Sequence, residues 1–304
     1  MDTAYHIPVM LRESVDILEV NPRGVYVDAT LGGGGHSSAI LSRLGPEGRL
    51  ICLDMDPDAV ANAPQDSRVI PVRTNFRFIH NWVRLLGYDR AVDGILADLG
   101  VSSHQFDTPG RGFSFRFDAP LDMRMNSKAG ESAADLINTC SEERLADILH
   151  LYGEVDGSRR VASLICSARA KSPVRTTGEL NAALAPILPA VAPHKVLARI
   201  YQALRIEVNG EMRSLGHLLR GIARSLKPGG IAAVITYHSL EDRMVKNFFR
   251  SGDPAGKECT DIYGRRPSPF TVITRKPVLP GENEVTRNTR ARSAKLRAAR
   301  RTEL

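Results

Sequence analysis

Short apolar runs, most of which end at glycine or acidic residues, organise the first hundred residues of the chain. Four of them have the length and composition of buried strands: Val25–Ala29, Arg49–Leu53, Val69–Val72 and Val92–Ala97. Helical spacing follows the first run, and Pro57 with Asp58 is typical of a helix start after the second. This alternation predicts a parallel, doubly wound α/β sheet that binds ligands at the carboxyl ends of its strands.

A fifth strand of the same character, Gly230–Thr236, comes only after about 130 further residues, although one helix normally links such neighbours. The interval holds amphipathic helical patterns, with Ser141 as a helix cap and a capping box from Thr176 to Glu179. We therefore expect an inserted small helical domain that recognises the substrate. The expected division is a sheet domain, first part, over 1–107, the insertion over 108–205, and a second part with a basic C-terminal tail over 206–304.

Composition supports an ordinary globular protein. The 304 residues are 42% hydrophobic and 25% charged, and the length suits about two domains. The longest aliphatic run, Ile231–Ile235, is far too short to cross a bilayer, so we expect a cytoplasmic protein. The four cysteines are widely spaced without a CxxC pair, which predicts neither a disulfide framework nor a metal site.

The positive charge is concentrated at the C-terminus. Residues 257–304 carry 12 Lys and Arg against 5 acidic residues, which accounts for the whole net charge of +7. Arginine dominates, and its planar guanidinium pairs with two phosphate oxygens at once, so a nucleic acid is the expected partner, with a solvated tail as the alternative. Ala291, Ala294 and Ala298 recur at helical intervals, so we expect this segment to pack partly on the domain.

A glycine run, Gly32–Gly35, follows the first strand, and Asp54 ends the second. Such a turn lets backbone N–H groups approach a ligand, and a carboxylate at the second strand can accept both hydroxyl protons of an adenosine ribose. The spacing matches the dinucleotide pattern GxGxxG poorly. The acidic strand ends Asp28, Asp54 and Asp98 suit the sulfonium and amino groups of S-adenosylmethionine, although a nicotinamide or flavin cofactor, or a turn without ligand, stays open.

Several ordered motifs resemble the RsmH (MraW) family of bacterial 16S ribosomal RNA cytosine-N4 methyltransferases. The resemblance spans nearly the whole chain and is carried by Asp28–Ser37, His6–Leu11, Asp93–Ser103, Arg111–Phe115, Pro120–Met125, Gln202–Ile206 and His238–Arg243. Tyr237 stands where the family commonly has phenylalanine, a difference that we expect to matter little. Ala192–Val196 fits the family pattern only loosely.

The resemblance implies a Rossmann-like S-adenosylmethionine-dependent methyltransferase sheet with the helical insertion. It also implies a cytosine in the decoding region of 16S rRNA as the target, within the small ribosomal subunit, and it allows a homodimer. Donor contacts carry over to the following positions: Gly34, Gly35, His36, Asp54, Phe76, Asp98 and Gln105. Phe76 could equally belong to the core, His36 could cap a helix or face solvent, and Asp98 could be a helix cap.

A cytosine amine is a weak nucleophile, so an enzyme must hold it in line with the methyl group and accept its protons. The Pro-Pro turn of other amino methyltransferases is absent after the fourth strand, and no cysteine sits in a nucleophile motif for methylation at carbon. The candidate catalytic residues are Asp98 and His238, with the hydroxyls of Ser102 and Ser103 as further acceptors. A structural role for His238 stays open.

A second candidate for RNA contact, besides the basic C-terminal tail, is an arginine-rich aromatic segment, and two alternative functions stay open. Arg111–Phe117 interleaves arginines with aromatic residues, which suits stacking on RNA bases, and a short core-facing strand is the alternative. A non-catalytic small-subunit assembly factor with a retained cofactor fold would bind subunits without transferring a methyl group. A nicotinamide-dependent oxidoreductase would bind NAD instead.

Overall fold

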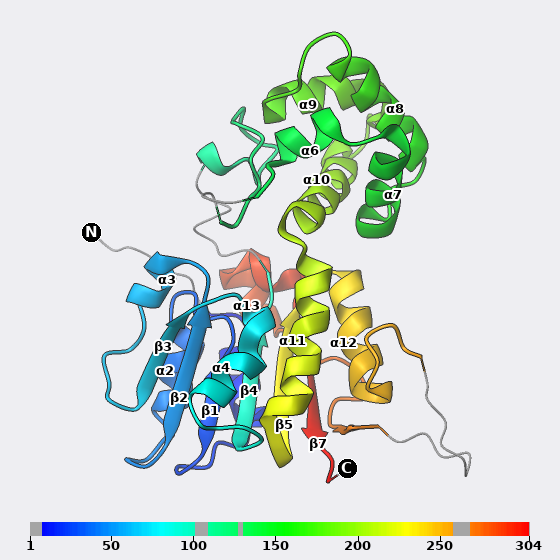
Figure 1. Cartoon of the computed structure of the whole chain (residues 1–304). Helices are drawn as coiled ribbons and strands as arrows, with labels where there is room; N and C mark the ends of the chain where they lie inside the picture. The colour runs from blue at the N-terminus through cyan, green and yellow to red at the C-terminus, as the bar shows by residue number, and fades with distance from the viewer. Residues whose placement is uncertain (1–7, 101–108, 127–129, 258–267, 304) are drawn as a thin grey trace. The chain divides into compact units, whose positions relative to one another are not determined.

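The computed structural model describes residues 8–100, 109–126, 130–257 and 268–303 (Figure 1). The chain divides into two compact units, residues 1–100 with 212–304 and residues 101–211, here called the sheet unit and the helical unit. The described elements, in chain order, are α1 (Leu11–Ile17), β1 (Val25–Asp28), α2 (Gly35–Leu41), β2 (Arg49–Asp54), α3 (Pro57–Ala61), β3 (Val69–Arg73), η1 (Phe76–Phe78), α4 (Ile79–Leu85), β4 (Val92–Asp98), η2 (Pro109–Arg111), α6 (Ala133–Thr139), α7 (Glu142–Gly153), α8 (Ser158–Arg169), α9 (Thr177–Leu184), η3 (Ala185–Ile187), α10 (Pro193–Asn209), α11 (Glu211–Ser225), β5 (Leu226–Thr236), α12 (Ser239–Ser251), β6 (Phe270–Val272), α13 (Glu282–Arg287), η4 (Thr289–Ser293) and β7 (Lys295–Arg301).

The sheet unit confirms the predicted α/β class. Among the described residues its strands form a seven-stranded sheet in the order β3-β2-β1-β4-β5-β7-β6. The first five of these pair in parallel, and β7 runs antiparallel to both of its neighbours. Because β1, β2 and β4 are adjacent and parallel, their terminal residues Asp28, Asp54 and Asp98 come to the same edge of the sheet.

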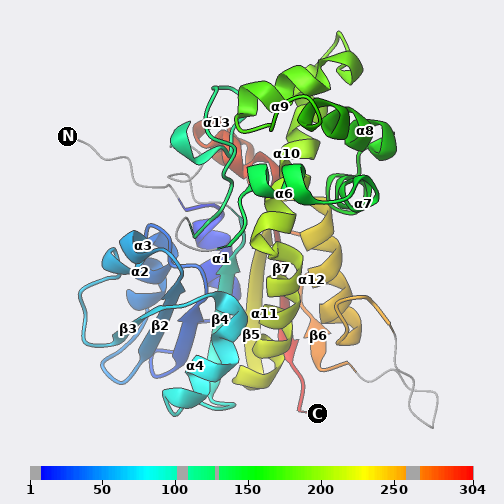
Figure 2. The ribbon, with the colours of Figure 1, turned by 45° about the horizontal axis from the view of Figure 1, so that its top comes forward.

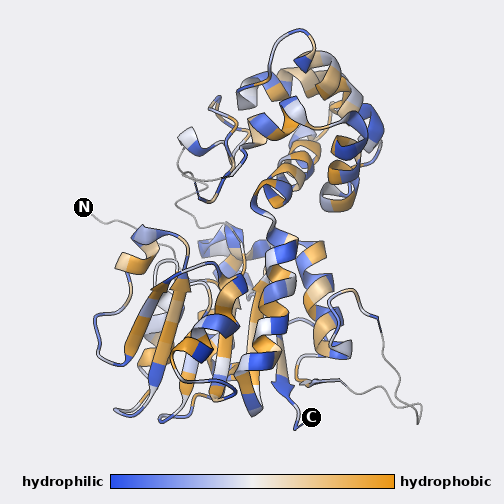
Figure 3. Cartoon of the chain, in the orientation of Figure 1, coloured by the Kyte–Doolittle hydropathy of each residue, from blue (hydrophilic) through white to orange (hydrophobic). Residues whose placement is uncertain are grey.

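Helices cover both faces of this sheet (Figure 2). On one face α4, α11 and α12 bury residues such as Val83, Leu219 and Phe248 against the strands. On the other face α1 and α2 do the same with Val15 and Ile40. The strands between these layers carry much of the hydrophobic colour of the unit (Figure 3), as expected of parallel strands that are buried on both sides.

The helical unit lies between β4 and β5 in the chain and has a core of its own, built mainly by α7, α8 and α10. The Ser141 cap and the Thr176–Glu179 capping box are both present. The unit spans 101–211, which is wider than the 108–205 expected from the sequence. At the C-terminal side the reason is local, because α10 continues to Asn209 and ends at Gly210, which adopts the left-handed conformation that glycine favours.

The C-terminal segment packs on the domain as expected, since Ala291, Ala294 and Ala298 are buried, but the helical spacing was misleading. Residues 295–301 form strand β7 between β5 and β6, and Leu296 and Ala299 pack into opposite faces of the sheet. Small residues at 298 and 299 fit a central strand as well as a helix, so their spacing did not distinguish the two. Arg297 is buried and paired with Asp242, so part of the basic segment belongs to the fold.

The strand alternative for Arg111–Phe117 was also wrong, since only the short helix η2 and turns occur there. Phe113 is buried, and Phe115 packs edge-on against Tyr201 in the helical core at a centroid distance of 5.5 Å. Phe117 is 59% exposed beside the exposed Arg116. One ring of the segment is therefore left for a partner.

In the described part of the chain, no helix combines the length and apolar character that a membrane span requires.

Candidate active site

Asp28 fixes the two ends of the glycine loop after β1 by hydrogen bonds. Its Oδ1 accepts a hydrogen bond from the Thr30 N–H at 3.1 Å, and its Oδ2 accepts one from the Ser37 hydroxyl at 2.6 Å. Both flanks of the loop are thus fixed to a carboxylate that is only 1% exposed. Gly34 has φ +76, and a Cβ there would lie 3.1 Å from the Asn62 carbonyl oxygen, so the loop requires glycine at this position.

Asp54 joins the end of β2 to the same loop. Its Oδ2 accepts the Gly32 N–H at 2.9 Å, and its Oδ1 accepts the Asp56 N–H at 2.9 Å. Burial raises the pKa of Asp54, while these two backbone donors act in the opposite direction. Each carboxylate oxygen keeps a second lone pair, so the group can also accept hydrogen bonds from two hydroxyls.

Phe76 lies beyond the next strand, in η1. The Asn75 Oδ1 accepts the Arg77 N–H at 2.9 Å and begins this short helix, and the Asn75 amide lies 2.8 Å from the Met55 sulfur. Phe76 itself is partly buried against the core of the sheet unit. The ring is therefore part core and part surface, at a strand end next to that of Asp54.

Asp98, at the end of β4, lies in a network with His36 and Tyr237. Its Oδ1 accepts the Tyr237 hydroxyl at 2.7 Å, and its Oδ2 lies 4.0 Å from the His36 Nδ1. The Asp98 backbone N–H donates to the Thr30 hydroxyl at 2.7 Å. The His36 Nε2 lies 3.0 Å from the Val9 carbonyl oxygen, which can only accept, so Nε2 carries a proton and Nδ1 faces Asp98.

Tyr237 is the functional candidate that sequence reasoning missed. The expectation that tyrosine instead of phenylalanine matters little stays a prediction, but its hydroxyl is the group that donates to Asp98. Burial raises the pKa of Tyr237, and the charge of Asp98 raises it further, so the phenol stays protonated and remains a donor. Ile235 pairs with Asp98 in the sheet, so strand order places residue 237 close by, but no sequence signal gave the direction of its side chain.

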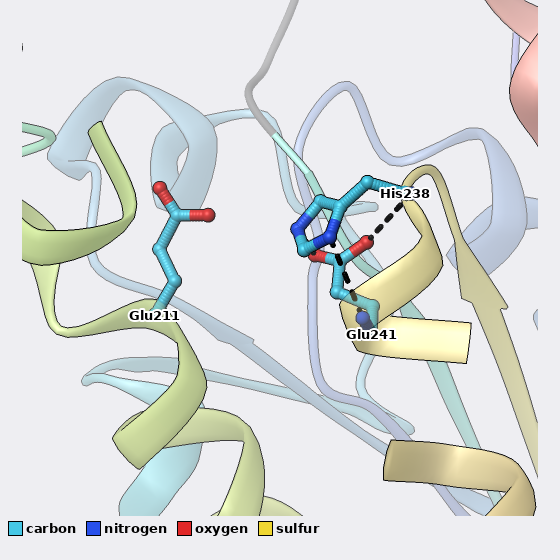
Figure 4. Close-up of side chains that lie close together, drawn as sticks. All are labelled: Glu211, His238 and Glu241. Carbon is cyan, nitrogen blue, oxygen red and sulfur yellow. Dashed lines mark hydrogen bonds and ion pairs between the residues drawn. The ribbon is translucent and has the colours of Figure 1, made fainter. Parts of the chain in front are cut away.

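His238 begins α12 as its N-cap. The Nδ1 accepts the Glu241 N–H at 3.4 Å, while the Nε2 lies 3.3 Å from the Glu241 Oε1 without hydrogen-bond geometry (Figure 4). The other Glu241 oxygen accepts the Tyr237 N–H at 2.9 Å. Both ring nitrogens therefore face Glu241, which gives His238 a structural position at the helix start. Gln105, Ser102 and Ser103 lie outside the described residues.

A sheet of this order, with antiparallel β7 between β5 and β6, a glycine loop after β1 and an acidic residue ending β2, defines a Rossmann-like S-adenosylmethionine-dependent methyltransferase. The model of the MraW methylase family matches residues 3–302. The chain belongs to the MraW methylase family, which excludes the nicotinamide oxidoreductase.

Close relatives span the whole chain. It is 52% identical over 298 residues to the ribosomal RNA small subunit methyltransferase H of Parabacteroides distasonis, covering 98% of both chains. It is 53% identical, with the same coverage, to the protein of that name from Bacteroides fragilis. Among solved structures, a putative rRNA-methylase from Clostridium thermocellum aligns over 97% of this chain and 99% of that one, with TM-score 0.41 and 14% identity.

The residues at the strand ends fit S-adenosylmethionine. Asp54 offers acceptors of the kind that ribose hydroxyls need, Gly34 has the left-handed backbone of a tight glycine turn, and Asp98 brings negative charge to the same edge. When bound, the donor supplies a methyl group that is activated by the positive sulfonium. The protein's part is to orient the acceptor and to take up its proton.

Proposed function

We propose that this protein methylates the N4 amine of a cytosine in the decoding region of 16S rRNA. The names of the close relatives support a small-subunit ribosomal RNA target. The observation that carries the choice of an amine is the Asp98 carboxylate, which is held between the Tyr237 hydroxyl and the His36 ring at the end of β4. A carboxylate can accept a hydrogen bond from an amine and then its proton, once the methyl group has been transferred.

The state of the thiols in the described residues favours an amine over a ring carbon as the methylated atom. Methylation at cytosine carbon 5 requires a thiolate nucleophile. Cys52 lies behind the glycine loop, and burial raises its pKa to about 12. Burial also raises the pKa values of Cys140 and Cys166 in the helical unit. None of these three thiols is activated at neutral pH.

Two surfaces are proposed to contact the RNA. In the helical unit, the exposed Phe117 ring and Arg116 suit an unstacked base and its phosphate. In the sheet unit, Arg287, Arg290 and Arg292 are exposed around α13 and η4. Glu284 of α13 accepts the Met10 N–H at 2.7 Å, and the neighbouring Val9 carbonyl oxygen lies 3.0 Å from the His36 Nε2. These arginines therefore lie near the edge of the sheet that carries the proposed S-adenosylmethionine site.

The test is transfer of labelled methyl from S-adenosylmethionine to unmethylated small subunits and to free 16S rRNA, followed by mass spectrometry of the nucleosides. Label in N4-methylcytidine supports the proposal. Binding of subunits and donor without transfer would favour the assembly factor instead. Label in another nucleoside would keep the methyltransferase class and refute the proposed target.

A further inference from the structure

We propose that Tyr237 is a positioning residue: its phenol holds the Asp98 carboxylate in the orientation from which Asp98 meets the target amine. The hydroxyl donates to the Asp98 Oδ1 at 2.7 Å. The inference rests on the proposed function, because it takes Asp98 as the group that accepts from the amine. It assigns a reaction role to a side chain that does not itself reach the reacting atoms.

Tyr237 is fixed at both ends of the residue. Its backbone N–H donates to the Glu241 Oε2 at 2.9 Å, which ties it to the first turn of α12. Its ring lies against Gly100, where a Cβ would come within 3.1 Å of the ring carbon Cδ2. Gly100 has φ +134, so both its conformation and the adjacent ring require glycine there. The position of the phenol is therefore set by the backbone hydrogen bond of Tyr237 to Glu241 and by the contact of its ring with Gly100.

The charges around the pair keep the phenol a donor. Among the described residues, the titratable groups facing the pair are His36 from α2, Glu241 from α12 and Glu284 from α13. The two glutamates and Asp98 all disfavour the phenolate, in addition to burial. A protonated phenol beside an ionised carboxylate forms a charge-assisted hydrogen bond, which is stronger than one between neutral groups.

This bond gives the two oxygens of Asp98 different tasks. Oδ1 is occupied by Tyr237, and the backbone of Asp98 is fixed through the Thr30 hydroxyl. Rotation of the carboxylate would break the bond to Tyr237, so Oδ2 is kept on the side of His36. Holding the acceptor in one orientation removes part of the entropic cost of aligning it with the amine. Phenylalanine would fill the same space and remove this hydrogen bond from the carboxylate.

The test compares Tyr237→Phe with Tyr88→Phe, a partly buried tyrosine that packs in the core on the other face of the sheet. With small subunits as substrate, Tyr237→Phe should lower kcat by about tenfold or more, with little change in KM. The acid limb of its kcat profile should move to higher pH, because the lost donor favours the protonated carboxyl. Tyr88→Phe should change neither. Calorimetric titration with S-adenosylhomocysteine shows that each variant is folded and binds stoichiometrically.

A double-mutant cycle with Asp98→Asn decides whether the effect passes through Asp98. In the Asp98→Asn background, Tyr237→Phe should change the single-turnover rate by less than about twofold. An equal loss in both backgrounds, or an unchanged rate and pH profile in Tyr237→Phe alone, overturns the inference. If Asp98→Asn itself leaves transfer unchanged, the proposed role of Asp98 fails. If Asp98→Asn is impaired and Tyr237→Phe is not, only the positioning role fails.

Discussion

The backbone N–H of Gly32 donates a 2.9 Å hydrogen bond to the Asp54 carboxylate, although 22 residues separate the two. The bond joins the glycine loop after β1 to the end of β2, so the carboxylate that we propose as the acceptor for the donor's ribose also shapes the loop. Loop geometry and donor affinity should therefore depend on the same residue.

Asp54→Ala is expected to weaken binding of S-adenosylhomocysteine by at least about tenfold, because the ribose hydroxyls and the Gly32 N–H all lose their acceptor. Isothermal titration measures the change. The matched control is Asp56→Ala, which removes only the cap of α3 and should cost about 1 kcal/mol of stability with unchanged affinity. Equal affinities for both variants would mean that Asp54 does not contact the donor.

Gly34→Ala should lower both stability and donor affinity. The left-handed backbone, with φ +76, costs a residue with a Cβ about 1–2 kcal/mol, and the Cβ also crowds the Asn62 carbonyl. Gly87→Ala is the control, since Gly87 has φ +84 but nothing within 4 Å. Thermal melting should show a loss of stability in both variants. Titration with S-adenosylhomocysteine should show a loss of affinity in Gly34→Ala only. A Gly34→Ala protein that binds normally would exclude the loop from the donor site.

Arg297→Met should destabilise the sheet unit by about 2–3 kcal/mol, because it leaves the nearly buried Asp242 with only Lys295. Arg300→Met on the same strand is the control. Its pair with Glu19 is exposed, so the expected loss is under about 1 kcal/mol. Urea unfolding at pH 7 compares the two, and equal losses would contradict a structural role for the buried pair.

The same pair predicts a dependence on pH. Burial raises the pKa of Asp242, but Arg297 and Lys295 outweigh this and hold it below its usual value of 3.8. A carboxyl whose pKa is lowered by folding stabilises the protein above its unfolded pKa, and this stability is lost as the pH falls through the folded value. The difference in unfolding midpoint between wild type and Arg297→Met should therefore shrink from pH 7 to pH 3. A constant difference would mean that the charge of Asp242 contributes nothing.

The sequence predicted the parts of the fold that local pattern determines. Apolar runs ending at Asp28, Asp54 and Asp98 predicted three strands that the structure places side by side, whereas the hydrogen bond from Gly32 to Asp54 was not predicted. Strand β7 was missed because its alanines and buried Arg297 lack the alternation of a strand, and antiparallel pairing with β5 is a tertiary property. Tyr237 was missed because its partner Asp98 lies 139 residues away.

The measurement that tests the central claim most directly is the single-turnover rate of labelled methyl transfer to small ribosomal subunits by wild type and Asp98→Asn. The asparagine keeps the shape of the side chain and an oxygen for the Tyr237 hydroxyl, but it cannot take up a proton. We expect wild type to form N4-methylcytidine and Asp98→Asn to do so at least about a hundredfold more slowly, while both bind S-adenosylhomocysteine. Equal rates, or label in a nucleoside other than N4-methylcytidine, would contradict the account.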